Sequence, residues 1–187
     1  AFISVAANAV YGYSVQVMGF TFMFFLGIGT ATSVRVAEHY GRGDFQGVKD
    51  ASRLGVAATF VLGVSLAILI YIFKDNVALL LVNSEASIDG TMLAVAISSL
   101  LIYAALATTF DGVQATASMA LRAQGIVWIP SAIHLASFFL LMIPLCYVMG
   151  VSLGRGAQGM MEAITITLLI AGGLQWGLLE WKTARRE

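Results

Sequence analysis

Asp111 is the residue whose type and place in this sequence point most directly to chemistry, because it is a carboxylate inside a long apolar run. Between Gly90 and Leu121 no other residue carries a charge, and Arg122 closes the run. Read as a helix, the run places Asp111 about 16 Å from Arg122, near the middle of a hydrocarbon core roughly 30 Å thick. A carboxylate there costs about 2.5 kcal/mol or more to insert, and such residues normally handle ions, protons or substrates. We therefore expect Asp111 to bind a coupling cation, either H⁺ or Na⁺.

Several polar residues share the helical face of Asp111. Spacings of three and four residues place Thr108, Gln114, Ser118 and Arg122 on that face. Lipid cannot hydrogen-bond such a stripe, so we expect Thr108, Gln114 and Ser118 to line a cavity or to meet other helices. The alternative is that Asp111 only ties two helices together. Hydrogen bonds between membrane helices average about 0.6 kcal/mol, which would hardly offset the cost of inserting a carboxylate.

Other polar residues in apolar segments give weaker signals. Asn8 and Gln16 could line the same cavity, or they could make ordinary helix contacts. Glu162 lies within two turns of a segment end, so we expect it to reach water. His134 could relay a proton, but a single histidine near a helix end favours a packed or interfacial neutral side chain. We expect Pro130 and Pro144 to start and to kink the segment that contains them.

The composition indicates that membrane helices position these residues. Of 187 residues, 59% are hydrophobic and 11% are charged, with a mean hydropathy of +0.90, whereas soluble domains carry about 25% charged residues. The formal net charge of zero argues against nucleic acid as a partner. Neither a cofactor nor a metal-spaced His/Cys cluster is indicated. We predict an all-α integral membrane protein with five spans at about 9–34, 54–73, 90–121, 127–150 and 157–179.

The distribution of Lys and Arg predicts the orientation of the spans. Basic residues gather between the first and second spans, after the third and after the fifth, at Arg35, Arg42, Lys49, Arg53, Arg122, Lys182, Arg185 and Arg186. By the positive-inside rule these parts face the cytoplasm, which puts the N-terminus outside and the C-terminus inside. One upstream helix would complete a six-helix unit, and many secondary transporters pair two such units. Since the sequence also lacks an initiator Met, we expect residues 1–187 to be part of one lobe.

Short segments along the whole chain resemble the MATE family (multidrug and toxic compound extrusion transporters), specifically helices eight to twelve of its C-terminal half. Ala6-Ala7-Asn8 resembles the Ala-Ala-His that opens the eighth helix, and Gly156-Ala157-Gln158-Gly159 is similar to the entry of the twelfth. Phe110-Asp111-Gly112-Val113-Gln114, followed by Leu121-Arg122-Ala123-Gln124-Gly125, resembles the tenth helix and its exit, and 26–36 resemble the cytoplasmic end of the eighth. Asn8 and Ala123 depart from the family pattern, which has His and Gly there.

The resemblance implies a twelve-helix, cation-coupled antiporter of the bacterial inner membrane that exports organic cations and amphipathic drugs. Two six-helix lobes would surround a central cavity, so the partners are the substrates, the lipid bilayer and an N-terminal lobe. In the family an acidic residue of the tenth helix takes part in sodium or proton coupling, and Asp111 matches it. A second family carboxylate lies in the seventh helix, which this chain does not contain.

Three alternatives stay open from the residues alone. A lipid-linked saccharide flippase of the same superfamily would be expected to carry more buried cationic residues. A membrane-embedded protease is suggested by Gly41-Arg42-Gly43-Asp44, which spells the GxGD pattern of intramembrane aspartyl proteases, but these residues lie among charges outside any apolar span. A scaffold subunit without transport activity would leave the burial of Asp111 unexplained.

Overall fold

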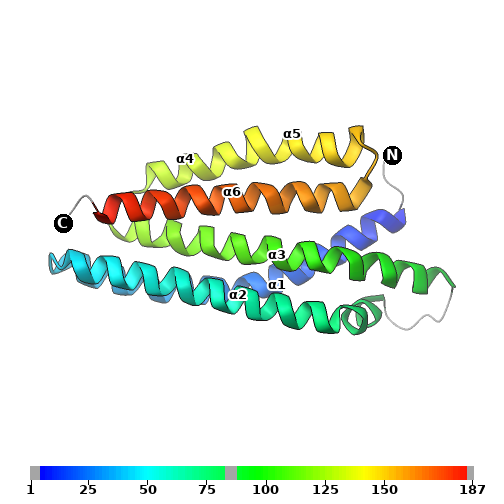
Figure 1. Cartoon of the computed structure of the whole chain (residues 1–187), viewed down its shortest axis with the longest axis horizontal. Helices are drawn as coiled ribbons and strands as arrows, with labels where there is room; N and C mark the ends of the chain where they lie inside the picture. Colours follow the sequence, from blue (N-terminus) through cyan, green and yellow to red (C-terminus); the bar gives the residue numbers. More distant parts are fainter. Residues whose placement is uncertain (1–4, 83–87, 185–187) are drawn as a thin grey trace.

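The computed structural model describes residues 5–82 and 88–184, and within these ranges the side chains of residues 5–11, 13, 80–82 and 88–93 are not described. The described residues form a bundle of long helices that run side by side (Figure 1). In chain order the elements are α1 (Val5–Gly41), α2 (Phe45–Val82), α3 (Ile88–Ala123), α4 (Trp128–Ala136), η1 (Ser137–Met142), α5 (Ile143–Cys146), η2 (Tyr147–Ser152) and α6 (Gly156–Ala184).

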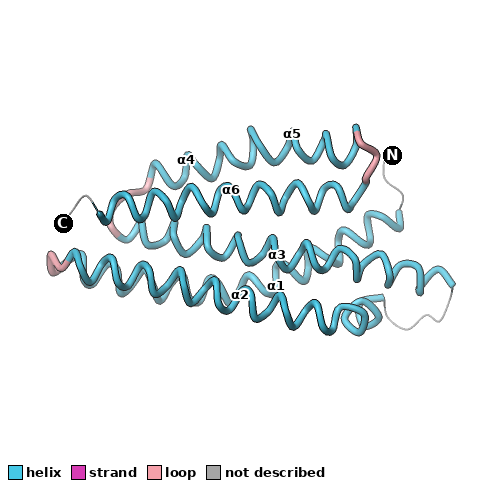
Figure 2. Tube along the Cα trace, viewed as in Figure 1, coloured by secondary structure: helices cyan, strands magenta, loops and turns pink. Residues whose placement is uncertain are grey.

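Within residues 5–82 and 88–184, five helical segments are long and apolar enough to cross a membrane, with α4 through η2 together forming the fourth. Figure 2 shows that short turns at 42–44, 124–127 and 153–155 join them. The predicted all-α membrane fold with five spans is therefore confirmed. The helices extend past the predicted limits, most clearly in α2, which begins at Phe45 rather than near residue 54. Asp44 caps this start, because its Oδ1 accepts a hydrogen bond of 2.9 Å from the Gly47 backbone N–H.

Helix α3 lies at the centre of the bundle and packs against α1, α2 and α6. Small residues make these contacts close. Gly63 of α2 lies against Thr109 of α3, and Gly112 of α3 lies against the ring of Phe25 on α1. Without a hydrophobic driving force inside lipid, such close approach is a main source of attraction between membrane helices.

The fourth span is irregular around Pro144. Two π-helical stretches, η1 and η2, flank the short helix α5, whose second residue is Pro144. Proline has no N–H to continue the helical ladder, and its ring crowds the preceding turn, so a locally wider turn accommodates it. Pro130 lies in the first turn of α4, where a missing N–H leaves no helical bond unmade. Pro130 lies near the start of the span as expected, and the expected kink at Pro144 stays a prediction.

Candidate functional site

Asp111 lies near the middle of the central helix α3, and its side chain is half-buried. None of the described residues forms a hydrogen bond or an ion pair with its carboxylate. Every other acidic residue whose side chain is described has a partner. These residues are Glu38, Asp44, Asp50, Asp75, Glu162 and Glu180. Within the described part of the chain, Asp111 is therefore the one carboxylate that no protein group satisfies.

Contacts of the two adjacent residues show the direction in which Asp111 points. Gly112 packs against the ring of Phe25 on α1, and the carbonyl oxygen of Phe110 lies 3.1 Å from the position that a Cβ on Gly172 of α6 would occupy. Successive residues of an α-helix are rotated by about 100°, so these two contacts lie on either side of Asp111. Asp111 therefore points between α1 and α6.

The side of α3 opposite Asp111 is covered by α2. There the Thr116 hydroxyl lies 2.9 Å from the hydroxyl of Thr59, and both side chains are fully buried. Ser118 and Arg122 follow Asp111 at spacings that keep them on its own face, and they are half-buried and exposed, respectively. The face that carries Asp111 thus becomes more open toward the end of α3, from buried Gln114 through half-buried Ser118 to exposed Arg122.

Gln114 joins α3 to the fourth span. Its side chain is 1% exposed, and its Nε2 lies 3.0 Å from Nδ1 of His134, whose ring stacks on Phe138 with centroids 4.5 Å apart. The Oε1 atom of Gln114 is buried and has no hydrogen-bond partner among the described residues. Gln114 therefore links α3 to α4 one helical turn from Asp111, and its Oε1 atom is still free to accept a hydrogen bond. His134 was expected to be packed or interfacial; it is exposed, so the packed alternative does not hold and the interfacial one stays a prediction.

The other predicted cavity residues lie in different surroundings. Thr108 is buried, and its hydroxyl donates a hydrogen bond of 2.7 Å to the Ala104 carbonyl of its own helix. Gln16 is exposed on α1, and the side chain of Asn8 lies outside the described side chains. The structure brings Thr108, Asp111, Gln114 and Ser118 together on α3. A role for any of them, or for Gln16 and Asn8, in lining a cavity stays a prediction.

Gln175 is a buried polar residue that sequence reasoning missed. It is fully buried in α6, its Nε2 donates to the Pro130 carbonyl at 3.3 Å, and its Oε1 has no partner among the described residues. The sequence does contain a sign of this residue's importance, because Gln175 is an amide within the apolar run of the fifth span. Together Gln114 and Gln175 connect α3 and α6 to the first turns of α4.

Glu162 corrects an expectation. It does not rely on water, because the guanidinium of Arg155 holds its carboxylate with a closest distance of 2.6 Å and the Gln158 amide donates a further bond of 3.1 Å. Only 11% of the Glu162 side chain remains exposed. The turn between η2 and α6 places Arg155 above the second turn of α6, which spacing in the sequence alone did not indicate.

No group of three or more His, Cys, Asp and Glu side chains within the described residues is placed to hold a metal ion. A single carboxylate without a partner among the described residues is a group that can bind a proton or a cation reversibly.

Comparison with known proteins identifies the family of this chain. The model of the MatE family matches residues 3–148. The chain belongs to the MatE family. This membership confirms the resemblance found in the sequence and places the chain in a family of transporters rather than of enzymes.

Relatives of the MatE family cover nearly all of this chain. A probable multidrug resistance protein NorM of Caulobacter vibrioides is 34% identical over 183 residues, which are 96% of this chain and 38% of that protein. The multidrug resistance protein NorM of Vibrio vulnificus is 29% identical over 95% of this chain and 38% of its own length. The chain thus spans less than two fifths of the length of these relatives.

The fold is also found in a solved structure. It is an inward-facing conformation of a multidrug resistance MATE family transporter of the MOP superfamily, with a TM-score of 0.85 over 99% of this chain and 43% of that chain. Sequence identity is 14%, so this likeness concerns the fold alone.

Proposed function

We propose that the full-length protein is a cation-coupled antiporter that exports organic cations and amphipathic drugs, and that Asp111 binds the coupling cation. The observation that carries this proposal is the absence of any partner for Asp111 among the described residues, in the middle of a membrane-spanning helix. A half-buried carboxylate without a partner in a membrane span is costly unless a proton or a cation neutralises it for part of the time. The relatives named multidrug resistance proteins supply the substrate class.

In this proposal transport is coupled because the ion and the cationic substrate compete for the Asp111 carboxylate. When H⁺ or Na⁺ occupies Asp111, its charge no longer attracts a cationic substrate, and when the ion leaves, the charge returns. If the two ligands favour different states of an alternating-access cycle, an ion gradient drives substrate in the opposite direction. A Na⁺ ion would draw its other ligands from neutral oxygen atoms or from the remainder of the protein.

The remainder of the protein would include a further helix and an N-terminal lobe. The Asp111 face of α3 is only partly covered by the described helices, and its polar residues cannot be left in lipid. We infer that this face meets the other parts of the transporter around a central cavity.

We infer the orientation from charge. The turn between α1 and α2, the turn between α3 and α4, and the end of α6 lie at one end of the bundle (Figure 1). That end carries Arg42, Lys49, Arg53, Arg122 and Lys182. It would face the cytoplasm, with the bundle in the inner membrane of a bacterium. The flippase alternative gains no support, since no Lys or Arg is buried in the described part of the chain.

Dye efflux from proteoliposomes tests the proposal. The full-length protein is reconstituted, and imposed H⁺ and Na⁺ gradients are applied separately to wild type and Asp111→Asn. We expect one of the two gradients to drive efflux by wild type, and neither to drive efflux by Asp111→Asn. The gradient that works names the ion.

Asp75→Asn is the matched control, because Asp75 is an exposed carboxylate that pairs with its neighbour Lys74 at 3.1 Å. It should keep wild-type efflux. Full gradient-driven efflux by Asp111→Asn would contradict the assigned role, and no efflux by folded wild type under either gradient would contradict the antiporter itself.

A further inference from the structure

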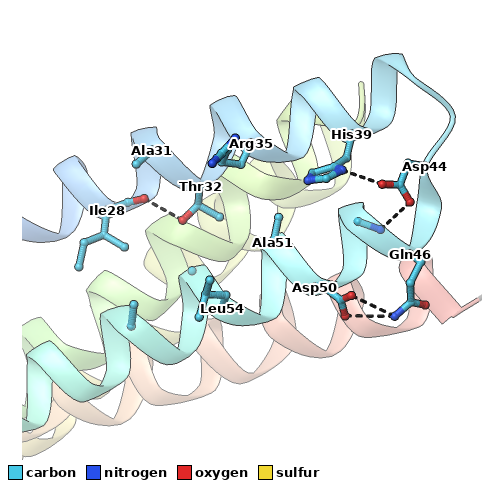
Figure 3. A pocket seen from close by; sticks show the side chains of 13 residues that line it. Ile28, Ala31, Thr32, Arg35, His39, Asp44, Gln46, Asp50, Ala51 and Leu54 are labelled. Atoms are coloured by element: carbon cyan, nitrogen blue, oxygen red, sulfur yellow. Dashed lines mark hydrogen bonds and ion pairs between the residues drawn. The ribbon is translucent and has the colours of Figure 1, made fainter.

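A groove of about 870 Å³ runs between α1 and α2 at the end of the bundle where these helices join (Figure 3). Its floor is a close contact between the two helices, in which Thr32 of α1 lies directly on Gly55 of α2. A side chain at position 55 would meet the Thr32 hydroxyl, so glycine is what allows the helices to meet there. Farther toward the turn, His39 and Asp44 close the groove, with Nδ1 and Oδ2 2.8 Å apart.

The groove faces away from the centre of the bundle. On α1 the residues that pack toward α3, such as Phe25 and Val36, are fully buried. Residues on the walls of the groove lie on another face of the same helices, where Leu54 is 72% exposed and the Arg35 side chain is 71% exposed. In a membrane protein an open apolar surface of this kind marks a contact with lipid or with another protein surface.

The lining changes from apolar to charged along the groove. Ile28 and Ala31 of α1 and Leu54 and Ala58 of α2 line its inner part. Arg35 on α1 and Asp50 on α2 lie nearer the turn, on opposite walls (Figure 3). From Ile28 to Arg35, and from Ala58 to Asp50, the helices rise by about 10–12 Å. That distance fits within one leaflet of a hydrocarbon core roughly 30 Å thick.

The two walls carry opposite charges at the mouth. Arg35 forms an exposed pair with Glu38 at 3.2 Å, and its guanidinium has several more donors than that pair uses. Asp50 is exposed and accepts bonds of 3.1 and 3.2 Å from the Gln46 amide, which leaves its negative charge unneutralised by that partner. A phosphate beside Arg35 and an ammonium group beside Asp50 would complement both walls. A purely cationic drug would be repelled by Arg35, and a purely anionic headgroup by Asp50.

We propose that the groove between α1 and α2 is a binding site for a zwitterionic phospholipid with a primary ammonium headgroup. Its acyl chain lies along Ile28, Ala31, Leu54 and Ala58, its phosphate binds Arg35, and its ammonium group binds Asp50. Basic pockets between membrane helices are known to hold phosphate-bearing lipid headgroups. The site lies on a different face from Asp111, so the proposal does not depend on cation coupling.

Photo-crosslinking tests the site. The full-length protein in nanodiscs of phosphatidylcholine is loaded with a phosphatidylethanolamine analogue that carries a photoreactive group on its acyl chain, and labelled peptides are mapped. We expect labelling in the segments around Ile28 and Leu54. Unlabelled phosphatidylethanolamine should suppress it about tenfold better than phosphatidylcholine or phosphatidylglycerol, because only its headgroup forms both charge-assisted bonds.

Variants at exposed positions separate the headgroup contacts from general lipid contact. Arg35→Gln and Asp50→Asn should each remove most of the advantage of phosphatidylethanolamine, and Leu54→Trp should reduce labelling by filling the groove. Arg42→Gln is the matched control, because Arg42 is as exposed as Arg35 and pairs with the same Glu38, at 2.7 Å, but does not line the groove. It should label like wild type.

Three results would overturn the proposal. Labelling spread evenly over all lipid-facing helices would show ordinary annular lipid, and equal competition by phosphatidylcholine would remove the role of the ammonium group. Absent labelling in wild type would show that another part of the protein fills the groove. Dye efflux measured on the same samples reports separately on the transport proposal.

Discussion

Asp111 and Glu162 are two carboxylates inside membrane-spanning helices, and their surroundings differ. Glu162 lies near one end of α6, with the Arg155 guanidinium 2.6 Å away and the Gln158 amide at 3.1 Å. Asp111 lies in the middle of α3, and no described residue bonds to it. The difference is that the fold provides hydrogen-bond and ion-pair partners for Glu162 and provides none for Asp111 among the described residues. The carboxylate that it leaves without a partner is available to a mobile cation.

A second paired carboxylate, Glu180, lies at the other end of α6. There Glu180 of α6 accepts hydrogen bonds of 2.9 and 2.6 Å from Arg53 of α2. This pair fixes the two helix ends to one another. Paired carboxylates therefore occur at both ends of α6, and the lack of a partner is particular to Asp111 among the described acidic residues.

Supplying Asp111 with a partner should abolish coupling without removing the carboxylate. Ala115 is half-buried and lies one helical turn after Asp111, so Lys in Ala115→Lys can form an i,i+4 ion pair with it. The fixed ammonium then takes the place of the coupling cation. We expect gradient-driven dye efflux to fall to the level of protein-free liposomes.

Ala115→Gln is the control for that variant, because it adds a side chain of similar length without charge. It should keep most of the efflux. Equal loss in both variants would assign the effect to bulk at position 115, and normal efflux by Ala115→Lys would argue that Asp111 does not bind the cation.

Removing the partner of Glu162 should make that carboxylate resemble Asp111, with a cost in stability. In Arg155→Gln the mostly buried Glu162 loses its ion pair, which should lower the free energy of unfolding by about 1–3 kcal/mol. Thermal unfolding of the purified full-length protein measures the loss. Adding Glu162→Gln should restore part of it, whereas additive losses in the double variant would show that the two side chains do not act as a pair.

Breaking the pair between Arg53 and Glu180 should have a smaller effect. Both side chains are partly open to solvent, with exposed fractions of 53% and 31%. Exposed ion pairs contribute about 0–1 kcal/mol, so a double-mutant cycle with Arg53→Gln and Glu180→Gln should give a coupling energy in that range. A coupling energy well above it would mean that this end of the bundle is more shielded from water than the structure indicates.

The smallest effect is expected at Asp44, in the turn before α2. The Gly47 backbone N–H, and next the His39 side chain, hold the pKa of Asp44 below its ordinary value of 3.8. A lowered pKa in the folded state stabilises the protein above about pH 4, and this contribution is lost as the pH falls through the lowered pKa. Below pH 4 the Tm of wild type should therefore fall slightly more steeply than that of Asp44→Asn. Parallel curves would show that ionised Asp44 contributes nothing.

The spans could be predicted from sequence because apolar length is decisive in a membrane. The ends of the helices could not, since α2 continues through Lys49, Asp50 and Arg53 before its apolar part begins. Hydropathy marks where lipid starts, whereas the helix itself starts at the cap formed by Asp44.

Part of the candidate site could be predicted from the sequence, and part of it could not. Asp111 was evident because a single charge in an apolar run has no local explanation. The bond between Gln114 and His134, the burial of Gln175 and the pair between Glu162 and Arg155 depend on which helices become neighbours. Spacing along one helix carries no information about that, so these contacts required the structure.

The binding of a fluorescent cationic dye to the purified full-length protein tests the central claim most directly. Dye affinity is measured against pH and against Na⁺ concentration, for wild type and Asp111→Asn. If the cation and the dye compete through Asp111, the wild-type affinity falls as H⁺ or Na⁺ rises, and the affinity of Asp111→Asn does not respond to that ion. A wild-type response in folded Asp111→Asn would contradict the account.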